Sequence, residues 1–360
     1  MIKYRVGIVG ATGMVGQRFI SILANHPWFE VGAVAASFRS AGLSYAKAVE
    51  GRWAFDWPIP AQVASMTVLD GTDVAAVSEH VDFVFCAVDM PKDATRELEV
   101  AYAQHETPVI SNNSAHRMAP DVPMMIPEIN ADHAAVIETQ RRRLGTRVGF
   151  VAVKPNCSIQ SYVPVLHPLR SFGLEAVSVC TYQAISGAGK TFARWPEMLD
   201  NVIPFISGEE EKSEQEPMKI WGTLQNGLIV PASTPTISAQ CLRVAASDGH
   251  MAAVSVRFAR KPSREEILEC WRNFKALPQE MQLPSAPQPL LQYMEEENRP
   301  QTRLDRDFQH GMGISIGRLR PDSLYDYRFV GLSHNTLRGA AGGGVLIAEL
   351  LCKLGYIPHK

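Results

Sequence analysis

A glycine-rich turn close to the start of the chain, from Gly10 to Gly16, is the feature that most constrains the fold. An apolar, β-prone run over Tyr4–Val9 precedes the turn, and a helical pattern of apolar residues follows it. A strand that enters a helix through glycines brings free backbone N–H groups and the positive end of the helix dipole to one point, where a pyrophosphate can bind. The residues expected to contact such a group are Gly10, Thr12, Gly13, Met14 and Val15.

The rest of the chain shows two patterns of apolar residues, which predict two kinds of sheet. Up to about residue 150, short apolar runs alternate with helix-compatible segments, as in a parallel, doubly wound sheet. Later runs are longer and alternate polar with apolar residues, which is typical of a mostly antiparallel sheet with one face on helices. The fold class predicted is therefore α/β, with an N-terminal Rossmann-type parallel sheet followed by an α+β domain with a mostly antiparallel sheet. The runs are 29–35, 81–88 and 109–111, then 176–183, 251–260, 313–318 and 325–332.

Three segments follow from this division. Residues 1–156 are expected to form the nucleotide-binding domain and residues 157–335 the catalytic domain. Residues 336–360 contain a helix, at 340–354, that is apolar on much of its surface and should pack back against the first domain. The stretch 284–300 is rich in Pro, Gln and Glu, which predicts an exposed loop.

Composition narrows the possible functions. The formal net charge is -2 with both signs intermixed, so the chain offers no broad basic field for nucleic acid and no cationic stretch for a membrane surface. No secretory leader pattern opens the sequence, and we expect a cytoplasmic protein. The six cysteines lie far apart without zinc-site spacing, which argues against a structural metal or a disulfide framework.

The end of the second predicted strand indicates which nucleotide binds. NAD-binding domains of this type carry an Asp or Glu there to accept hydrogen bonds from the ribose. This chain has Ser37, Arg39 and Ser40 instead. Hydroxyls and a guanidinium suit a 2′-phosphate, which a carboxylate would repel. The cofactor predicted is NADP.

A second glycine segment, Ser186-Gly187-Ala188-Gly189-Lys190-Thr191, has a different interpretation from the first. The phosphate loop of nucleotide hydrolases requires glycine where this chain has Ala184. We therefore interpret Gly187 as a position where the backbone approaches the cofactor closely.

Cys157 is the candidate nucleophile. An apolar strand ends at Pro155, and Asn156-Cys157 then opens a helix-compatible segment that Pro164 and Pro168 should bend. Free N–H groups at a helix start lower the pKa of a thiol and can bind an oxyanion, so we expect a lowered pKa for Cys157.

A cysteine at a helix start is more often structural than catalytic. A catalytic role for Cys157 therefore depends on a base that the fold brings near the thiol. Arg243 and His250 stand just before a predicted strand, and Gly249 allows a sharp turn that could aim the imidazole into a cleft. A base near a thiol is the pattern of nucleophilic catalysis.

Several multi-residue motifs together resemble aspartate-semialdehyde dehydrogenase, over essentially the whole chain. The likeness is nearest to the archaeal and fungal branch of that family. The motifs are Asn156-Cys157, Arg243 with His250 seven positions later, Ser333-His334-Asn335-Thr336, Arg303-Leu304-Asp305-Arg306-Asp307 and Arg338-Gly339-Ala340-Ala341-Gly342.

The resemblance implies a role for each of these residues. Cys157 would form the acyl thioester and His250 would be the acid/base. The substrate-binding residues implied are Arg243 for the α-carboxylate, Glu209 for the amine, Lys212 and Arg117 for phosphate, and Asn156 beside the nucleophile, while Gly187 and Asn335 would contact NADP.

The implied reaction is the reversible, NADPH-dependent reduction of L-4-aspartyl phosphate to L-aspartate 4-semialdehyde and phosphate, on the route to lysine, methionine and threonine. The family implies a homodimer or homotetramer with a catalytic and dimerisation domain. Two alternatives stay open at this stage. One is an acyl-CoA or N-acetylglutamyl-phosphate reductase on the same scaffold, and the other is an NADP-binding sensor without turnover.

Overall fold

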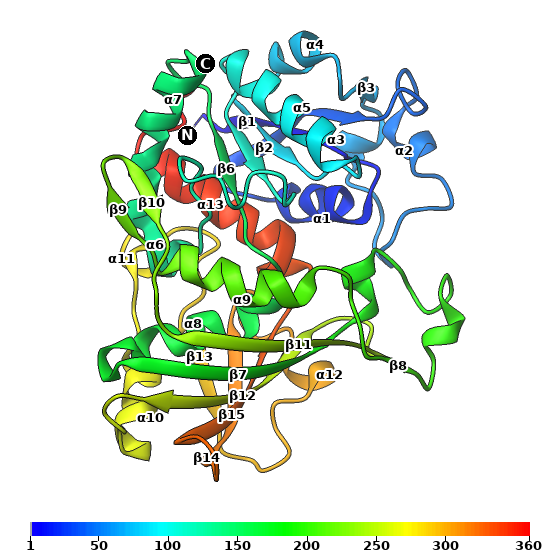
Figure 1. The fold of residues 1–360 in the computed structure, drawn as a ribbon. Coiled ribbons are helices and arrows are strands. Elements are labelled where there is room, and N and C mark those ends of the chain that lie inside the picture. Colours follow the sequence, from blue (N-terminus) through cyan, green and yellow to red (C-terminus); the bar gives the residue numbers. More distant parts are fainter. Residues whose placement is uncertain (1) are drawn as a thin grey trace.

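The computed structural model describes residues 2–360 and arranges them around two sheets (Figure 1). The first sheet has six strands, all parallel, in the order β3-β2-β1-β4-β5-β6. The strand order reverses between β1 and β4, and in open sheets of this type ligands bind outside the carboxyl ends of the strands at such a point. The strands are β1 (Tyr4–Val9), β2 (Phe29–Ala36), β3 (Leu69–Asp70), β4 (Phe83–Cys86), β5 (Val109–Ser111) and β6 (Val151–Val153).

Helices cover both faces of this sheet, which explains why its strands are almost continuously apolar. Phe83 and Phe85 of β4 pack in one core cluster with α1 and α13, whereas Val84 packs in the other with α4 and α5. The helices of the first half of the chain are α1 (Met14–Leu23), α2 (Tyr45–Ala48), α3 (Ala61–Ala64), α4 (Val74–Ser78), α5 (Lys92–Gln104), α6 (Pro127–Asn130) and α7 (Ile137–Leu144).

The second sheet has seven strands in the order β13-β14-β15-β12-β7-β11-β8. Its pairings are antiparallel except for β13 with β14 and β7 with β11, so the expected mostly antiparallel sheet is confirmed. A two-stranded hairpin, β9 (Thr223–Gln225) and β10 (Leu228–Val230), stands apart. The sheet strands are β7 (Leu174–Gln183), β8 (Val202–Ile203), β11 (Thr236–Val244), β12 (His250–Phe258), β13 (Leu291–Met294), β14 (Ile314–Pro321) and β15 (Tyr327–Ser333).

Alternate residues of β7 and β12 are buried, as in a sheet with one covered face. The neighbours on the opposite face, including Ser178, Cys180 and Ala253, are only partly buried. The helices of this half are α8 (Val163–Leu166), α9 (Glu209–Ile220), α10 (Arg264–Asn273), α11 (Leu277–Glu280), α12 (Thr302–Asp305) and α13 (Gly342–Lys353).

Three local expectations are wrong. The stretch 284–300 is not simply an exposed loop, because it contains edge strand β13, and Leu290 and Leu291 are buried. The helix expected after Cys157 is a single 3-10 turn, Ser158–Ser161, followed by the four-residue α8. Pro164 lies in the first turn of α8, where its missing N–H costs nothing, so it starts that helix and does not bend it.

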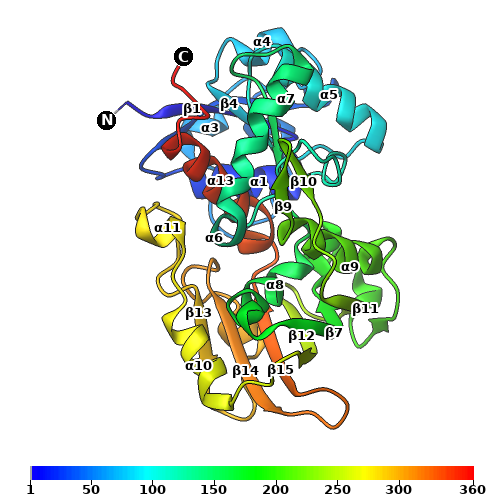
Figure 2. The same ribbon diagram turned by 60° about the vertical axis from the view of Figure 1, so that its left-hand side comes forward.

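The C-terminal helix α13 lies beside the first sheet (Figures 1 and 2). It contacts α1 and β5, and its residues from Gly342 to Cys352 are buried. A π-helical turn, Leu337–Ala341, leads into it from the second sheet. Domain limits at 156/157 and 335/336 stay a prediction. Among residues 2–360, no helix combines the length and the apolar character that crossing a bilayer requires.

Candidate active site

A cavity of about 280 Å³ lies where β6 leads into Cys157, and both halves of the chain contribute to its walls. Ser111 and Val153 pair at the ends of β5 and β6, and the residues just after these strands form one wall. The start of α9 and the turn before α13 form the others. The predicted site residues that line this cavity are Val15, Arg117, Asn156, Cys157, Gly187, Glu209, Lys212 and Asn335.

Cys157 sits at the N-cap of the 3-10 turn, under the π-helical segment. A Cβ at Gly339 would lie 2.9 Å from the Cys157 Cβ, so only glycine allows that segment to pass so close. Burial raises the pKa of the Cys157 thiol, and the carboxylate of Glu209 raises it further. The expected lowering of the thiol pKa is therefore wrong, because a four-residue turn offers little helix dipole against burial and a nearby anion.

Arg243 lies near the end of β11 and His250 is the first residue of β12. Both side chains form hydrogen bonds with the backbone of Ala184. Arg243 donates through Nη1 to the Ala184 carbonyl at 2.8 Å, and the Ala184 N–H donates to His250 Nδ1 at 3.0 Å. Gly249, with φ of +96°, makes the turn that brings His250 into place. A Cβ at Gly187 would lie 2.9 Å from Arg243 Nη1 and 3.0 Å from His250 Nε2, so a side chain at this position would press on both groups.

Glu209, the first residue of α9, receives a ring of donors. Asn156 Nδ2 reaches both carboxylate oxygens at 2.9 Å, Gln183 Nε2 reaches one at 3.1 Å, and Lys212 Nζ reaches the other at 2.8 Å. Burial alone would raise the pKa of Glu209, but the Lys212 charge and these hydrogen bonds hold it below its usual value. The carboxylate is thus ionised in a buried place, as a ligand for an ammonium group must be.

Gln183 was not predicted as a site residue. It is the last residue of β7, and its side chain faces inward because the strand alternates. Its place directly before the Gly187 segment was the only signal in the sequence.

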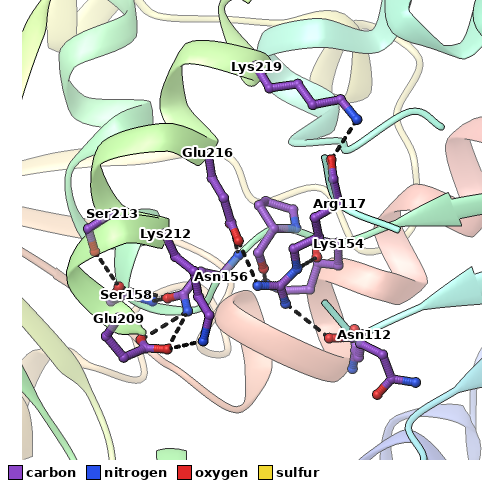
Figure 3. Close-up of polar contacts among 12 residues, drawn as sticks. Asn112, Arg117, Lys154, Asn156, Ser158, Glu209, Lys212, Ser213, Glu216 and Lys219 are labelled. Atoms are coloured by element: carbon purple, nitrogen blue, oxygen red, sulfur yellow. Dashed lines mark hydrogen bonds and ion pairs between the residues drawn. The ribbon is translucent and has the colours of Figure 1, made fainter. Parts of the chain in front are cut away.

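Arg117 is buried and already engaged (Figure 3). It donates to Glu216 at 2.8 Å, to the Lys154 carbonyl at 3.0 Å and to the Asn112 carbonyl at 3.1 Å. Glu216 in turn accepts the backbone N–H of Asn156 at 2.6 Å, so this ion pair also fixes the residue before the nucleophile. A guanidinium has five N–H donors, and those not used here remain for an anion in the cavity.

Two further polar side chains of the cavity wall, Lys154 and Asn112, were missed by sequence reasoning. Lys154 is buried and donates through Nζ to the Pro155 carbonyl at 2.5 Å. The Asn112 side-chain oxygen and nitrogen are buried without hydrogen-bond partners among residues 2–360. Buried amides are normally paired, so an unpaired one in a cavity wall is available to a ligand.

A second cavity, of about 520 Å³, lies at the carboxyl ends of β1 and β2. Gly10, Thr12, Gly13 and Ser37 line it together with Arg52, which sequence reasoning missed. Gly10 has φ of +91°, and a Cβ there would lie 2.3 Å from the Ala87 carbonyl oxygen.

Gly13 caps α1 without a side chain of its own, so the first turn of that helix stays open to an anion. This cradle fits the pyrophosphate of a dinucleotide.

The other residues predicted to hold the cofactor have different surroundings. Arg39 is exposed, with its guanidinium 5.8 Å from the Phe38 ring, and Ser40 is buried. Within residues 2–360, neither lines the second cavity. Met14 lines an adjoining cavity, and Asn335 is held by Gly249 N–H at 2.8 Å and by the Ser186 hydroxyl at 2.8 Å.

Comparison with known families gives one result along the chain. Residues 5–137 match the family model "Semialdehyde dehydrogenase, NAD binding domain", and residues 166–338 match "Semialdehyde dehydrogenase, dimerisation domain".

Individual proteins agree with this. The chain is 43% identical over 351 residues to the aspartate-semialdehyde dehydrogenase of Archaeoglobus fulgidus, covering 98% of each. It is 40% identical over 371 residues to that of Aspergillus fumigatus, covering 99% of each. The crystal structure of the Candida albicans enzyme with NADP superposes with a TM-score of 0.88 at 37% identity, over 99% of this chain and 100% of that one.

Proposed function

The chain belongs to the aspartate-semialdehyde dehydrogenase family, and from this premise we propose that it converts L-4-aspartyl phosphate reversibly into L-aspartate 4-semialdehyde through a thioester on Cys157. It is an NADP-dependent oxidoreductase of amino-acid biosynthesis. The residue roles are supported by the way in which the fold brings the predicted residues together. Cys157, Glu209 and Gly187 line one cavity, and Arg243 Nη1 and His250 Nε2 lie within 3.0 Å of where a Cβ of Gly187 would be.

In the reducing direction, the sulfur of Cys157 attacks the acyl carbon and phosphate leaves. NADPH, when bound, supplies the hydride that reduces the thioester. His250 carries its proton on Nε2, because Nδ1 accepts the Ala184 N–H, and this N–H can donate a hydrogen bond to the substrate oxygen as reduction of the thioester makes that oxygen negative. When the C–S bond breaks, the oxygen regains its double bond to carbon, the aldehyde leaves and the thiolate of Cys157 is restored.

The two ends of the substrate meet opposite charges. Arg243 is buried, and a guanidinium can bind the α-carboxylate through two parallel hydrogen bonds. Glu209 would hold the α-ammonium group. Lys212 and Arg117 would bind the phosphate, since each uses only part of its N–H donors on its carboxylate partner.

The adenosine end of NADP would lie in the second cavity, with its pyrophosphate at Gly13 and its 2′-phosphate near Ser37. Arg52 lines the same cavity and is a candidate for a charge partner of that phosphate. Gly187 and Asn335 belong to the catalytic cavity, where the nicotinamide must reach the thioester.

Reduction of NADP⁺ at 340 nm with L-aspartate 4-semialdehyde tests the proposal. We expect turnover that depends on inorganic phosphate and that coenzyme A does not replace. Equal turnover with coenzyme A and without phosphate would show an acyl-CoA reductase, and NADP binding without turnover would show a sensor.

A matched pair of cysteine variants tests the nucleophile. Cys157→Ala should lower turnover by at least about a thousandfold while NADP still binds, because it removes a reacting atom. Cys270→Ala, in α10, removes a partly buried thiol outside the cavity and should keep turnover near that of the wild type. Comparable turnover in the two variants would contradict the thioester mechanism.

A further inference from the structure

The tautomer of His250 decides whether this ring can take the proton of the Cys157 thiol. Because Nδ1 accepts the Ala184 N–H, the neutral ring carries its proton on Nε2, and Nε2 has no hydrogen-bond partner among residues 2–360. Burial, together with the charge of Arg243, lowers the pKa of His250 to about 3, so the ring is neutral near pH 7. In this tautomer the Nε2–H donor of His250 lies next to Gly187, which lines the cavity, and the ring has no free nitrogen to accept the proton of the Cys157 thiol.

Lys154 lines the same cavity as Cys157, and its amine can accept the thiol proton. Its Nζ makes one hydrogen bond within residues 2–360, to the Pro155 carbonyl, and forms no ion pair there. The other cations expected at the phosphate are already neutralised, Arg117 by Glu216 and Lys212 by Glu209. A buried ammonium without a carboxylate is costly, so the neutral amine is accessible to Lys154.

The π-helical segment and the start of α13 place Lys154 next to the nucleophile. A Cβ at Gly339 would lie 2.9 Å from Cys157 Cβ, and a Cβ at Gly343 would lie 3.2 Å from Lys154 Cε. Positions four apart on a helix share a face. The two side chains therefore pack against neighbouring points of one helical face, and both line the catalytic cavity.

The charges around Lys154 oppose one another. Burial lowers the pKa of Lys154 to about 7, while Cys157 and Glu216 favour its charged form and Arg117 and Arg338 disfavour it. Burial raises the pKa of the Cys157 thiol, whereas the charge of Lys154 lowers it. Each of the two groups therefore favours the charged form of the other, and an ammonium at Lys154 stabilises a thiolate at Cys157.

We propose that Lys154 accepts the proton of the Cys157 thiol, directly or through one water, and so generates the attacking thiolate. The S–H bond breaks, its electron pair stays on sulfur, and the proton forms a bond to Nζ, so the pair remains neutral overall. The ammonium then lies beside the thiolate until the sulfur attacks. This deepens the proposed function, since it rests on Cys157 being the nucleophile, and it leaves the Nε2 proton of His250 for the substrate oxygen.

The rate at which iodoacetamide alkylates Cys157, followed by mass spectrometry from pH 5 to pH 10, tests the assignment without substrate. We expect the midpoint in Lys154→Met to lie at least one pH unit above that of the wild type, with alkylation at pH 7 about tenfold slower. His250→Gln should keep the wild-type midpoint. An unchanged midpoint in Lys154→Met, or an equal rise in His250→Gln, would overturn the proposal.

Two further measurements separate other roles of Lys154. Lys154→Arg keeps a positive charge at every pH, so its midpoint should not exceed that of the wild type, and a raised midpoint would also contradict the proposal. If Lys154 only binds phosphate, Lys154→Met raises the phosphate KM and leaves the alkylation profile in place, which rejects proton acceptance. Failure of the proposed function is distinct, because it appears as absent phosphate-dependent aldehyde oxidation in the wild type.

Discussion

Gly187 has no side chain at the point where Arg243 and His250 come together, which makes it the most sensitive small residue of the site. We expect Gly187→Ala to lower kcat/KM for the aldehyde by roughly tenfold or more, since overpacking of about 1–3 kcal/mol falls on two groups that must hold the substrate. Steady-state kinetics measure the loss. The neighbouring Ala188 is exposed, and Ala188→Ser should keep wild-type kinetics. Equal kinetics in both variants would show that the contact is unimportant.

Ser37 faces the cavity that fits the adenosine half of NADP. Ser37→Asp should weaken NADP binding by about tenfold, or ~1.4 kcal/mol, because a carboxylate there repels the 2′-phosphate. NAD lacks that phosphate and serves as the internal control. Fluorescence titration of both nucleotides measures the difference, and a parallel loss for the two would place the 2′-phosphate elsewhere.

Residues with a signature at fixed sequence spacing could be predicted, and those defined by distant partners could not. Asn156-Cys157 and the Arg243–His250 spacing can be read directly from the chain. The Arg117–Glu216 pair joins residues 99 positions apart, and only the fold brings them together. The thiol pKa of Cys157 was predicted in the wrong direction for the same reason, since its burial and its Glu209 neighbour depend on tertiary packing.

At the level of elements, one face of α9 organises the site (Figure 3). Glu209, Glu216 and Lys219 occupy that face at helical spacing and hold Asn156, Arg117 and the loop after Arg117 respectively. Lys219 Nζ donates to three carbonyls of that loop, at 2.6, 2.6 and 2.8 Å. The resemblance implied a substrate contact for Glu209, but the roles of Glu216 and Lys219 on the same face of α9 became visible only in the fold.

Glu216 of α9 binds both the Arg117 guanidinium and the Asn156 N–H, so we expect its replacement to lower the stability of the fold. Glu216→Gln leaves the buried Arg117 guanidinium without its carboxylate, and we expect the free energy of unfolding to fall by about 3 kcal/mol. Urea denaturation measures this. Glu211→Gln, on the exposed side of the same helix, should change stability by less than about 0.5 kcal/mol. Matching urea midpoints in the two variants would show that the ion pair does not stabilise the fold.

Strands were predicted where an apolar run or a clear polar–apolar alternation marks them, and were missed where the sequence shows neither. β13 lies between prolines and polar residues, and its burial comes from its pairing with β14 across a sheet edge. β11 carries Ser238 and Gln240 between its inward residues, and sequence reasoning did not mark it as a strand. Both strands are specified by neighbours distant in sequence, which local propensity does not reflect.

At the scale of the whole molecule, the C-terminal segment ties the two sheets together around the cavity. Arg338 is buried, forms a two-pronged ion pair with Glu128 at 2.5 and 2.8 Å, and donates to Gln160 at 3.1 Å. It thereby joins α6 of the first half to the turn that follows Cys157. The apolar character of 340–354 predicted burial, but this buried pair gives no signal in the sequence.

The partly buried face of the second sheet makes a prediction about assembly. Residues 166–338 match a family model described as a dimerisation domain, and the face of β7 and β12 with Cys180 and Ala253 offers small, uncharged side chains for self-association. Ala253→Arg would place a charge in the middle of this face, where a second copy would bury it at a cost of several kcal/mol. We expect a wild-type dimer or tetramer in sedimentation velocity and a smaller species for Ala253→Arg. Leu324→Arg is the control, because Leu324 is 82% exposed on the β14–β15 hairpin and should leave the mass unchanged. If Ala253→Arg also keeps the wild-type mass, the subunits associate through another surface.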